Sequence, residues 1–315
     1  MKILILGGSG FLGTYLIDHL LYIGHEVTVF DRNEFPVRRL TSGGDVEQIT
    51  GDFADIEMVS SRLHDFDAIY HLISATLPHT SNADPAFDVC SNLLSTIRLL
   101  ELLRKTRRGK ARRIIFLSSG GTVYGDVQDK EISESAPTDP ICSYGITKLA
   151  IEKYLHLYER MHGIPYLVAR LSNPYGLNSK LSKKQGVIPI FLERILQREA
   201  IELWGDGTVT RDYIFASDVA IALGNMLNYN GVHKIFNIGS SQGSSLIDII
   251  KIIRDKTGIQ PNIIYGEKRE FDAKYNVLNT TVARRELGWA PTVNLIDGIG
   301  LLVDSYLEMH GFGIK

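Results

Sequence analysis

The N-terminal segment, residues 2–22, restricts the possible folds more than any other part of the chain. It begins with an apolar run, Lys2–Leu6, of the kind found in a parallel strand that is covered on both faces. The glycine-rich stretch Gly7–Gly13 comes next, and the amphipathic stretch Tyr15–Tyr22 follows it. A strand, a glycine turn and the start of a helix, in this order, are the context that a dinucleotide-binding fingerprint requires.

Three glycines in this turn have separate tasks in such a fingerprint. Gly7 allows the tight turn, Gly10 lets a pyrophosphate approach the helix N-terminus, and Gly13 lets helix and strand pack closely. Their spacing is G-x-x-G-x-x-G, with Gly8 also present, rather than the commoner G-x-G-x-x-G. A glycine turn that binds no nucleotide is the alternative, and the flanking strand and helix disfavour it.

The acidic residue after the second predicted strand bears on the choice of dinucleotide. That strand, Val27–Phe30, ends at Asp31. A carboxylate there accepts hydrogen bonds from the adenosine ribose hydroxyls and repels a 2′-phosphate. We therefore predict NAD rather than NADP as the cofactor. Arg32 beside it argues the other way, because an arginine is able to reach a 2′-phosphate.

Strands and helices alternate up to about residue 172, which predicts an α/β fold, a Rossmann-type doubly wound parallel sheet. The predicted strands are Lys2–Leu6, Val27–Phe30, Glu47–Thr50, Ala68–Leu72, Ile114–Leu117 and Tyr166–Leu171, with helices at about 11–22, 55–63, 85–107 and 142–162. After Ser172 the chain has short mixed segments, interrupted by another sheet strand at 235–239. We expect a dinucleotide-binding domain at 1–172 plus about 212–240, and a smaller, discontinuous C-terminal substrate lobe at about 173–211 and 241–315.

Composition argues against several classes of protein. The 315 residues include 34 basic and 36 acidic side chains, so the overall charge favours neither nucleic-acid nor membrane-surface binding. No apolar run reaches membrane-spanning length, and the first residues enter a core strand directly, so we expect no signal peptide and a cytoplasmic protein. The two cysteines, Cys90 and Cys142, lack metal-type spacing, so neither a metal site nor a disulfide framework is expected. We interpret the basic run Arg104–Arg113 as a helix end and a solvated loop rather than a nucleic-acid patch.

The chemistry of the chain is indicated by two segments, Ser118–Gly125 and Tyr144–Lys148. The second is a Y-x-x-x-K pattern, which on a helix places a phenol and an ammonium on one face, one turn apart. A tyrosine acts as a base near neutral pH only if a nearby positive charge favours its phenolate. Lys148, helped by an oxidised nicotinamide ring, would supply that charge. Alone the pattern is weak, because many helices contain it by chance.

Together these residues resemble the extended short-chain dehydrogenase/reductase family, and within it the nucleotide-sugar epimerases typified by UDP-glucose 4-epimerase. The resemblance runs nearly end to end and rests on the order and spacing of modest motifs. They are Gly7–Gly13, Asp31, Gly51-Asp52, His71-Leu72, Asn92, Ser118–Gly125, Tyr144–Lys148, Arg170–Gly176, Gly205–Gly207, Arg211–Tyr213, Arg269–Asp272 and Arg285–Trp289.

The resemblance implies a cofactor site and a catalytic group. Tyr144 and Lys148 are implied to be catalytic. His71 is given a structural or cofactor-lining role rather than proton transfer. The residues implied to bind NAD are Gly7, Gly10, Phe11, Leu12, Gly13, Asp31, Arg32, Asp52, Phe53, Leu72, Ile73, Ser74, Asn92, Ser118, Tyr144, Lys148 and Ser172.

The smaller lobe is implied to bind a nucleotide sugar, with a UDP-sugar favoured. Arg211 and Arg269 would bind the diphosphate, because planar guanidinium forks suit a dianion. Asp272 would accept hydrogen bonds from the ribose. The remaining residues implied to bind substrate are Asn173 (a phosphate oxygen or base carbonyl), Leu203 and Trp204 (the uracil edge, through backbone groups), Val187, Thr122 and Asn276.

Three reactions compete within such a family, and the loop before Val123 separates them. In 4-epimerisation, the Tyr144 phenolate removes the sugar 4-hydroxyl proton while hydride passes from C4 to NAD. The 4-keto sugar then turns over and takes the hydride back on its other face. Dehydratases and decarboxylases also need a carboxylate in this loop, which here reads Gly120-Gly121-Thr122. We therefore predict an isomerase, a NAD-dependent UDP-sugar 4-epimerase; another nucleotide-sugar reductase, dehydrogenase or dehydratase is the alternative.

The chain departs from the family pattern at Gly120, where many 4-epimerases have a serine or threonine that binds the reacting sugar oxygen. We expect Thr122 to replace it, on the premise that it faces the same side of an extended segment, with Ser119 as the alternative. Asn276 corresponds to the family's gatekeeper, where a tyrosine restricts the pocket to plain hexoses. The smaller asparagine predicts tolerance of a 2-N-acetyl group, unless Asn276 merely lines a loop.

The resemblance also bears on assembly and pathway. In the family, helices corresponding to about 85–107 and 142–162 pair across a homodimer as a four-helix bundle, and we expect the same here. Synthesis of surface-polysaccharide precursors is expected by analogy with the family alone.

Overall fold

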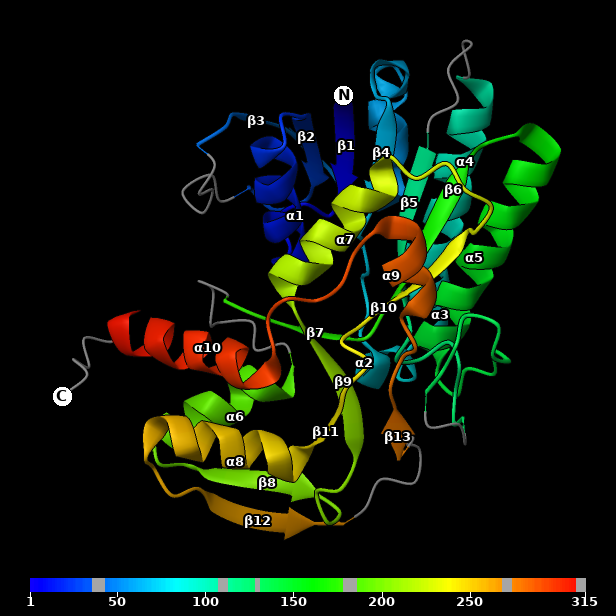
Figure 1. Ribbon diagram of the computed structural model, residues 1–315. Helices are drawn as coiled ribbons and strands as arrows, with labels where there is room; N and C mark the ends of the chain where they lie inside the picture. Colours follow the sequence, from blue (N-terminus) through cyan, green and yellow to red (C-terminus); the bar gives the residue numbers. More distant parts are fainter. Residues whose placement is uncertain (36–42, 107–112, 128–130, 178–185, 268–273, 310–315) are drawn as a thin grey trace.

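The larger part of the molecule is a seven-stranded parallel sheet. A computed structural model describes residues 1–35, 43–106, 113–127, 131–177, 186–267 and 274–309. The strands run in the order β10-β6-β5-β4-β1-β2-β3, which confirms the predicted Rossmann-type α/β fold (Figure 1). Their bounds are Lys2–Leu6 (β1), Glu26–Asp31 (β2), Val46–Thr50 (β3), Ala68–His71 (β4), Arg113–Ser119 (β5), Tyr166–Leu171 (β6) and Ile235–Ile238 (β10).

Helices cover both faces of this sheet, so its central strands are buried on both sides, as their apolar runs predict. On one face α1 (Phe11–Tyr22), α7 (Ala216–Leu227) and α9 (Thr281–Leu287) contribute to the core. On the other face the helices α4 (Ser95–Lys105) and α5 (Ser143–His162) pack on residues of the same strands. Helix α5 ends at Gly163, whose φ of 62° is the left-handed conformation that glycine adopts readily.

Two of the predicted helices are interrupted. The segment predicted at 55–63 is a 3₁₀ helix, Phe53–Val59, followed by a second one, Leu63–Asp65; Asp52 caps the first by accepting from Ala54 N–H at 2.9 Å. The segment predicted at 85–107 is divided into α3 (Pro85–Asp88), a π-helical stretch η4 (Val89–Leu94) and α4. A short helix, α2 (Pro78–Ser81), was not predicted. π-Helical turns are frequent at functional sites, and η4 lies beside the cleft described below.

The rest of the chain forms a smaller lobe with its own core (Figure 1, lower half). One sheet has β11 (Gly243–Ser245), β9 (Thr210–Phe215) and β13 (Tyr275–Asn276) in this order, and β7 (Asn173–Tyr175) also pairs with β9. A two-stranded parallel sheet joins β8 (Ala200–Trp204) to β12 (Asn262–Gly266). The helices are α6 (Val187–Leu196), α8 (Leu246–Thr257) and α10 (Leu295–Met309).

The chain passes between the two parts more than once. It leaves the large sheet after β6, enters the smaller lobe through β7 to β9, and returns through α7 and β10 before α8. The domain limits given above stay a prediction. Within the described residues no helix combines the length and the apolar character needed to cross a membrane.

Candidate active site

A cleft of about 1190 Å³ follows the carboxyl ends of β1, β2, β4, β5 and β6 and continues into the smaller lobe. Ligands of doubly wound sheets bind at this edge. Sixteen of the seventeen residues predicted for the cofactor line the cleft: Gly7, Gly10, Phe11, Leu12, Gly13, Asp31, Arg32, Asp52, Phe53, Leu72, Ile73, Ser74, Ser118, Tyr144, Lys148 and Ser172. From the predicted substrate residues, Asn173, Val187, Trp204 and Arg211 line its other end.

The glycine turn at the N-terminus of α1 forms a cradle suited to a dinucleotide. Gly7 has a φ of 86° and donates its N–H to Phe30 O at 2.9 Å, which joins the turn to β2. A Cβ atom on Gly13 would lie 2.4 Å from Gly8 O, so α1 and the turn approach each other more closely than a side chain allows. The backbone N–H groups of a helix N-terminus are the usual pyrophosphate site, and glycines there let the phosphate groups come close to the backbone.

We expect Gly13→Ala to purify without bound dinucleotide and to lose about 1–3 kcal/mol of unfolding free energy, because backbone must move to admit the methyl group. Gly300→Ala is the control: the new Cβ would meet only the flexible Lys256 side chain, whose nearest atom, Nζ, is 3.4 Å away. Gly300 lies within α10, so its replacement by alanine should raise the unfolding free energy by roughly 0.5–1 kcal/mol. Urea unfolding and assay of released dinucleotide measure both effects. Gly13→Ala with wild-type dinucleotide content would refute the cradle.

The carboxylates predicted to bind the adenosine half lie at the ends of their strands. Asp31 accepts from Ser9 N–H and Asn33 N–H, each at 3.0 Å, and so ties the glycine turn to the end of β2. Asp52 and Arg32 line the same stretch of the cleft. The polar groups therefore converge where the sequence places the ribose and the adenine.

Tyr144 and Lys148 lie on one face of α5 and both line the cleft. Lys148 Nζ is 5.6 Å from the centroid of the Tyr144 ring and donates to Leu117 O at 2.9 Å. Burial raises the pKa of Tyr144 to about 12, and a hydrogen bond with Ser74 acts in the opposite direction. Burial also lowers the pKa of Lys148 to about 8, while Asp88 and Glu152 raise it. Without a bound cofactor, the phenol is therefore protonated near neutral pH.

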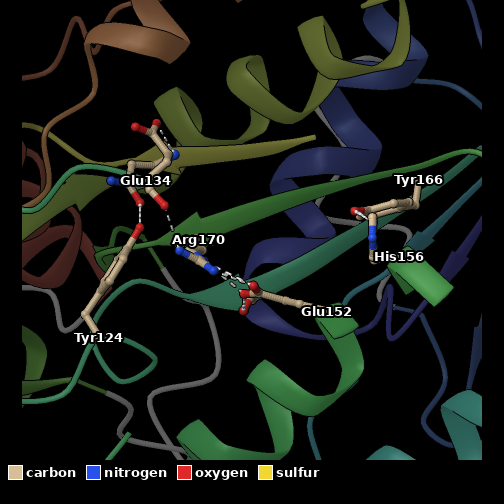
Figure 2. A network of polar contacts seen from close by, with 8 residues as sticks. Tyr124, Glu134, Glu152, His156, Tyr166 and Arg170 are labelled. Atoms are coloured by element: carbon tan, nitrogen blue, oxygen red, sulfur yellow. Dashed lines mark hydrogen bonds and ion pairs between the residues drawn. The ribbon is translucent and has the colours of Figure 1, made fainter. Parts of the chain in front are cut away.

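Glu152, one turn after Lys148 on α5, forms a buried ion pair with Arg170 of β6 (Figure 2). Arg170 Nη2 is 2.6 Å from Glu152 Oε2, and each side chain is 3% exposed. The Ser118 hydroxyl donates to Glu152 Oε1 at 2.6 Å, which connects the pair to the cleft lining. Arg170 also lies over the ring of Tyr124 at 4.8 Å and donates to Glu134 O at 3.4 Å. Sequence reasoning did not identify Glu152, although its position one turn after Lys148 gives a signal.

The structure corrects the premise for Thr122. Residues 120–122 form a turn, in which Thr122 N–H and Val123 N–H both donate to Ser119 O, so the segment is not extended. The Thr122 hydroxyl is buried without a hydrogen-bond partner among the described residues and is not part of the cleft lining given above. Ser119 does line the cleft. The absence of a side chain at Gly120 also has a cause, because a Cβ there would lie 2.5 Å from Leu278 Cδ1.

Three other predicted residues are described and do not line the cleft. Asn92 is buried beside it, where its Oδ1 accepts from Ala75 N–H at 2.9 Å. Leu203 is a core residue of the smaller lobe, so only its backbone is available to a base. Asn276 is buried and donates to Gly120 O at 3.2 Å, while its Oδ1 has no partner among the described residues. Arg269 and Asp272 lie outside the described residues.

His71 is buried at the end of β4, a placement compatible with the structural or cofactor-lining role expected of it. The Thr96 hydroxyl donates to Asn92 O at 2.6 Å, so the His71 Nε2, 2.8 Å from the same hydroxyl, is the donor between them. Burial, and to a lesser degree Lys148, lower the pKa of His71 to about 3. The ring is buried and makes edge contacts with Phe53 and Phe116.

Sequence reasoning missed several residues of the cleft. They come from the loop after β4 and the start of α2, from α3 and η4, and from the smaller lobe, and no sequence pattern indicated a site role for any of them. These are Thr76, Leu77, Pro78, Phe87, Ser91, Tyr175, Pro189, Val209, Tyr213 and Leu246.

The sheet, the glycine cradle and the Tyr144–Lys148 pair define a dinucleotide-dependent enzyme of the extended short-chain dehydrogenase/reductase type. Residues 3–239 match the model of the NAD dependent epimerase/dehydratase family. The chain belongs to this family, and NAD is its cofactor.

Relatives over the whole chain have more than one activity. A UDP-glucose 4-epimerase of Mycolicibacterium smegmatis is 31% identical over 97% of this chain and 98% of its own length. A dTDP-4-dehydro-6-deoxyglucose reductase of Escherichia coli is 32% identical, covering 96% of both. The crystal structure of a UDP-glucose 4-epimerase with UDP-glucose from Thermotoga maritima matches with a TM-score of 0.90 and 32% identity, over 98% of this chain and 100% of that one.

Proposed function

We propose that the protein catalyses NAD-dependent 4-epimerisation of a UDP-sugar, with Tyr144 as the base. One observation carries this proposal: Tyr144 and Lys148 line the cleft together, whereas the turn at 119–122 holds no carboxylate. Acid–base chemistry at a single carbinol needs one proton acceptor, and loss of water or of a carboxyl group needs more. The 4-epimerases among the relatives support the same reading.

The chain's own residues then divide the work as follows. Tyr144 takes the proton from the 4-hydroxyl and gives it back after the sugar has turned over. Lys148, held by Leu117 O, stabilises the phenolate. Bound NAD supplies the hydride acceptor and a positive charge, which opposes the effect of burial on the Tyr144 pKa. Ser118 and the Glu152–Arg170 pair fix the end of β5 against α5 beneath the reacting groups.

The smaller lobe would hold the UDP portion. Arg211 lines the cleft, where its guanidinium suits the diphosphate. Asn173 lies beside it on β7, where its side chain donates to Asp212 O at 3.1 Å. Trp204 and Val187 line the same end. Arg269 and Asp272 are kept as proposed ligands of the diphosphate and the ribose.

We propose that Ser119, rather than Thr122, supplies the hydroxyl that the family carries at Gly120. Ser119→Ala is expected to lower kcat about 10-fold, because one hydrogen bond to the reacting oxygen is worth roughly 1.4 kcal/mol in the transition state. Thr122→Val, which removes a hydroxyl outside the described cleft lining, should change kcat little. Turnover of both variants on one substrate checks this, and the opposite order would restore the role to Thr122.

The sugar is proposed as the glucose/galactose pair or its N-acetylhexosamine counterpart. Asn276 lies against the turn at Gly120 rather than across the cleft, so an acetamido group would meet no bulky gatekeeper there. Chromatography of products from UDP- and dTDP-linked hexoses and N-acetylhexosamines tests the proposal. Conversion of UDP-galactose to UDP-glucose is expected, with turnover of UDP-N-acetylgalactosamine as well. Inactivity on every UDP-sugar would refute the function, and inactivity on acetylated sugars alone would refute the role of Asn276.

A second candidate is a nucleotide-sugar reductase. It is favoured by the 32% identity to the Escherichia coli dTDP-4-dehydro-6-deoxyglucose reductase. Such an enzyme would consume one reduced cofactor for each ketosugar that it converts. Stoichiometric oxidation of added NADH by a dTDP-4-keto sugar would choose this reading.

Homodimerisation, a cytoplasmic location and a role in polysaccharide precursor synthesis stay predictions. The dimer has one support in the structure: large apolar side chains on α3, η4 and α5 are exposed, which an interface between helices requires. They are Phe87, Val89, Leu94, Ile146, Leu157 and Met161.

A further inference from the structure

A buried carboxylate lies behind the helix that carries Tyr144. Asp88, the last residue of α3, is 0% exposed and is not part of the described cleft lining. Both of its oxygens are fully engaged by neutral donors. Oδ1 accepts from the Thr76 hydroxyl and from Asn92 Nδ2 (2.9 Å), and Oδ2 accepts from the hydroxyls of Ser143 (2.8 Å) and Thr147 (2.7 Å).

These donors come from three separate segments. Thr76 belongs to the loop after β4 that lines the cleft, Asn92 to η4, and Ser143 and Thr147 to the first turns of α5 on either side of Tyr144. Two carboxylate oxygens thus join the cleft loop to the helix that bears the proposed base.

The same end of α5 depends on side chains from elsewhere for its capping. Its N-cap residue, Cys142, makes no capping hydrogen bond through its side chain. The N–H of Ser143 donates instead to Asn82 Oδ1 at 2.9 Å, and that of Tyr144 to Ser81 Oγ at 3.0 Å. The unpaired N–H groups of a helix start need such partners. Residues 76–92 therefore hold the first turn of α5 from two sides.

We propose that Asp88 is a positioning residue, which sets the place of Tyr144 in the cleft by joining the first turn of α5 to the loop at 75–76. This rests on the proposed function, in which Tyr144 is the base. Asparagine does not reproduce the arrangement, because one carboxylate oxygen becomes an NH₂ donor. Placed toward Asn92, that donor would face another amide donor, so it must turn toward Ser143 and Thr147. Their hydroxyls would then accept from a neutral amide instead of donating to a carboxylate, which weakens the contact with α5.

The charge of Asp88 also acts on the pKa values of the proposed catalytic groups, which packing alone would not do. It raises the pKa of both Tyr144 and Lys148. The other titratable groups that act on these two are Cys142, which raises the pKa of Tyr144, and Glu152, which raises that of Lys148; the neighbouring His71 is neutral. Loss of the Asp88 charge therefore lowers both pKa values.

The test compares Asp88→Asn with Asp218→Asn in the NAD-loaded protein. Asp218 is an equally buried carboxylate that accepts from the Thr292 hydroxyl (2.7 Å) and Val293 N–H (3.0 Å). For Asp88→Asn we expect kcat to fall about 10- to 100-fold with KM nearly unchanged, because the base is misplaced. Both limbs of the pH profile of kcat should move to lower pH, by roughly one pH unit. Asp218→Asn should leave both limbs of the pH profile where they are in the wild type. The proposal would be overturned if the limbs did not move in Asp88→Asn, or if they moved equally in the two variants.

Two further measurements keep the outcome decisive. If Asp88→Asn fails to fold, Ser143→Ala combined with Thr147→Val removes the donors on α5 and keeps the charge. This pair should lower kcat without moving the limbs, and an unchanged kcat would overturn the proposal. If no UDP-sugar is turned over, the proposed function fails by itself. Asp88 is then tested by ultraviolet titration of the Tyr144 phenolate. The signal of Tyr144 is obtained by subtracting the titration of the same protein carrying Tyr144→Phe. The resulting Tyr144 curve should lie at lower pH in Asp88→Asn than in the wild type.

Discussion

Tyr144→Phe is expected to lower kcat about 10²- to 10⁴-fold, the usual contribution of a positioned acid–base group. The substitution removes only the phenolic oxygen, so the ring remains beside Lys148 and the cleft keeps its shape. We therefore expect the variant to retain NAD and to bind the nucleotide sugar with a KM close to that of the wild type. Steady-state kinetics and dinucleotide release measure the two properties.

A matched control lies on the same helix. Tyr158→Phe removes the same atom from α5, where the hydroxyl donates to Glu101 at 2.7 Å. Tyr158 is not part of the described cleft lining, so kcat should stay within about 3-fold of the wild type, with a stability cost of roughly 1 kcal/mol for the lost hydrogen bond. Equal losses of activity in the two variants would mean that α5, rather than the Tyr144 phenol, is what the reaction needs.

Breaking the buried pair beneath the active site is expected to cost about 3–5 kcal/mol of unfolding free energy. In Glu152→Gln the Arg170 guanidinium keeps its charge, and its carboxylate partner is lost in a site where both side chains are almost fully buried (Figure 2). The Ser118 hydroxyl also loses a charged acceptor. Chemical denaturation at constant NAD concentration measures the change, because bound ligand itself adds to stability.

The double variant Glu152→Leu/Arg170→Met separates the charge from the packing. It removes both charges and keeps similar volume, so we expect it to recover most of the loss. Glu47→Gln is the control for an ion pair in solvent, since Glu47 and Arg62 are 51% and 38% exposed. Its cost should be about 0–1 kcal/mol. A cost for Glu152→Gln as small as that of Glu47→Gln would contradict the structural role given to the pair.

The parts of the fold that follow a regular pattern could be predicted from the sequence. The apolar runs gave the strands of the large sheet within a few residues, because strands buried on both faces are made mostly of apolar side chains. The cradle followed from Gly7 and Gly13, because a positive φ at the first and close packing at the second favour glycine. The Y-x-x-x-K spacing placed Tyr144 and Lys148 on one helical face.

Other parts depend on contacts between distant segments, which no local pattern reports. Thr122 was predicted from an extended segment, and a turn stabilised by Ser119 O took its place. Gly120 is small because Leu278, from the far end of the chain, packs against it. Asp88 had no motif at all, since its partners at 76, 92, 143 and 147 meet only when the chain is folded.

In the proposed 4-epimerisation, hydride leaves C4 of the sugar and returns to the same carbon within one active site. UDP-galactose carrying deuterium at C4 tests it most directly, with NAD-loaded protein and the product examined by NMR. We expect UDP-glucose that retains the deuterium at C4, with no net formation of NADH. UDP-glucose formed with hydrogen at C4, or deuterium found in released NADH, would contradict it.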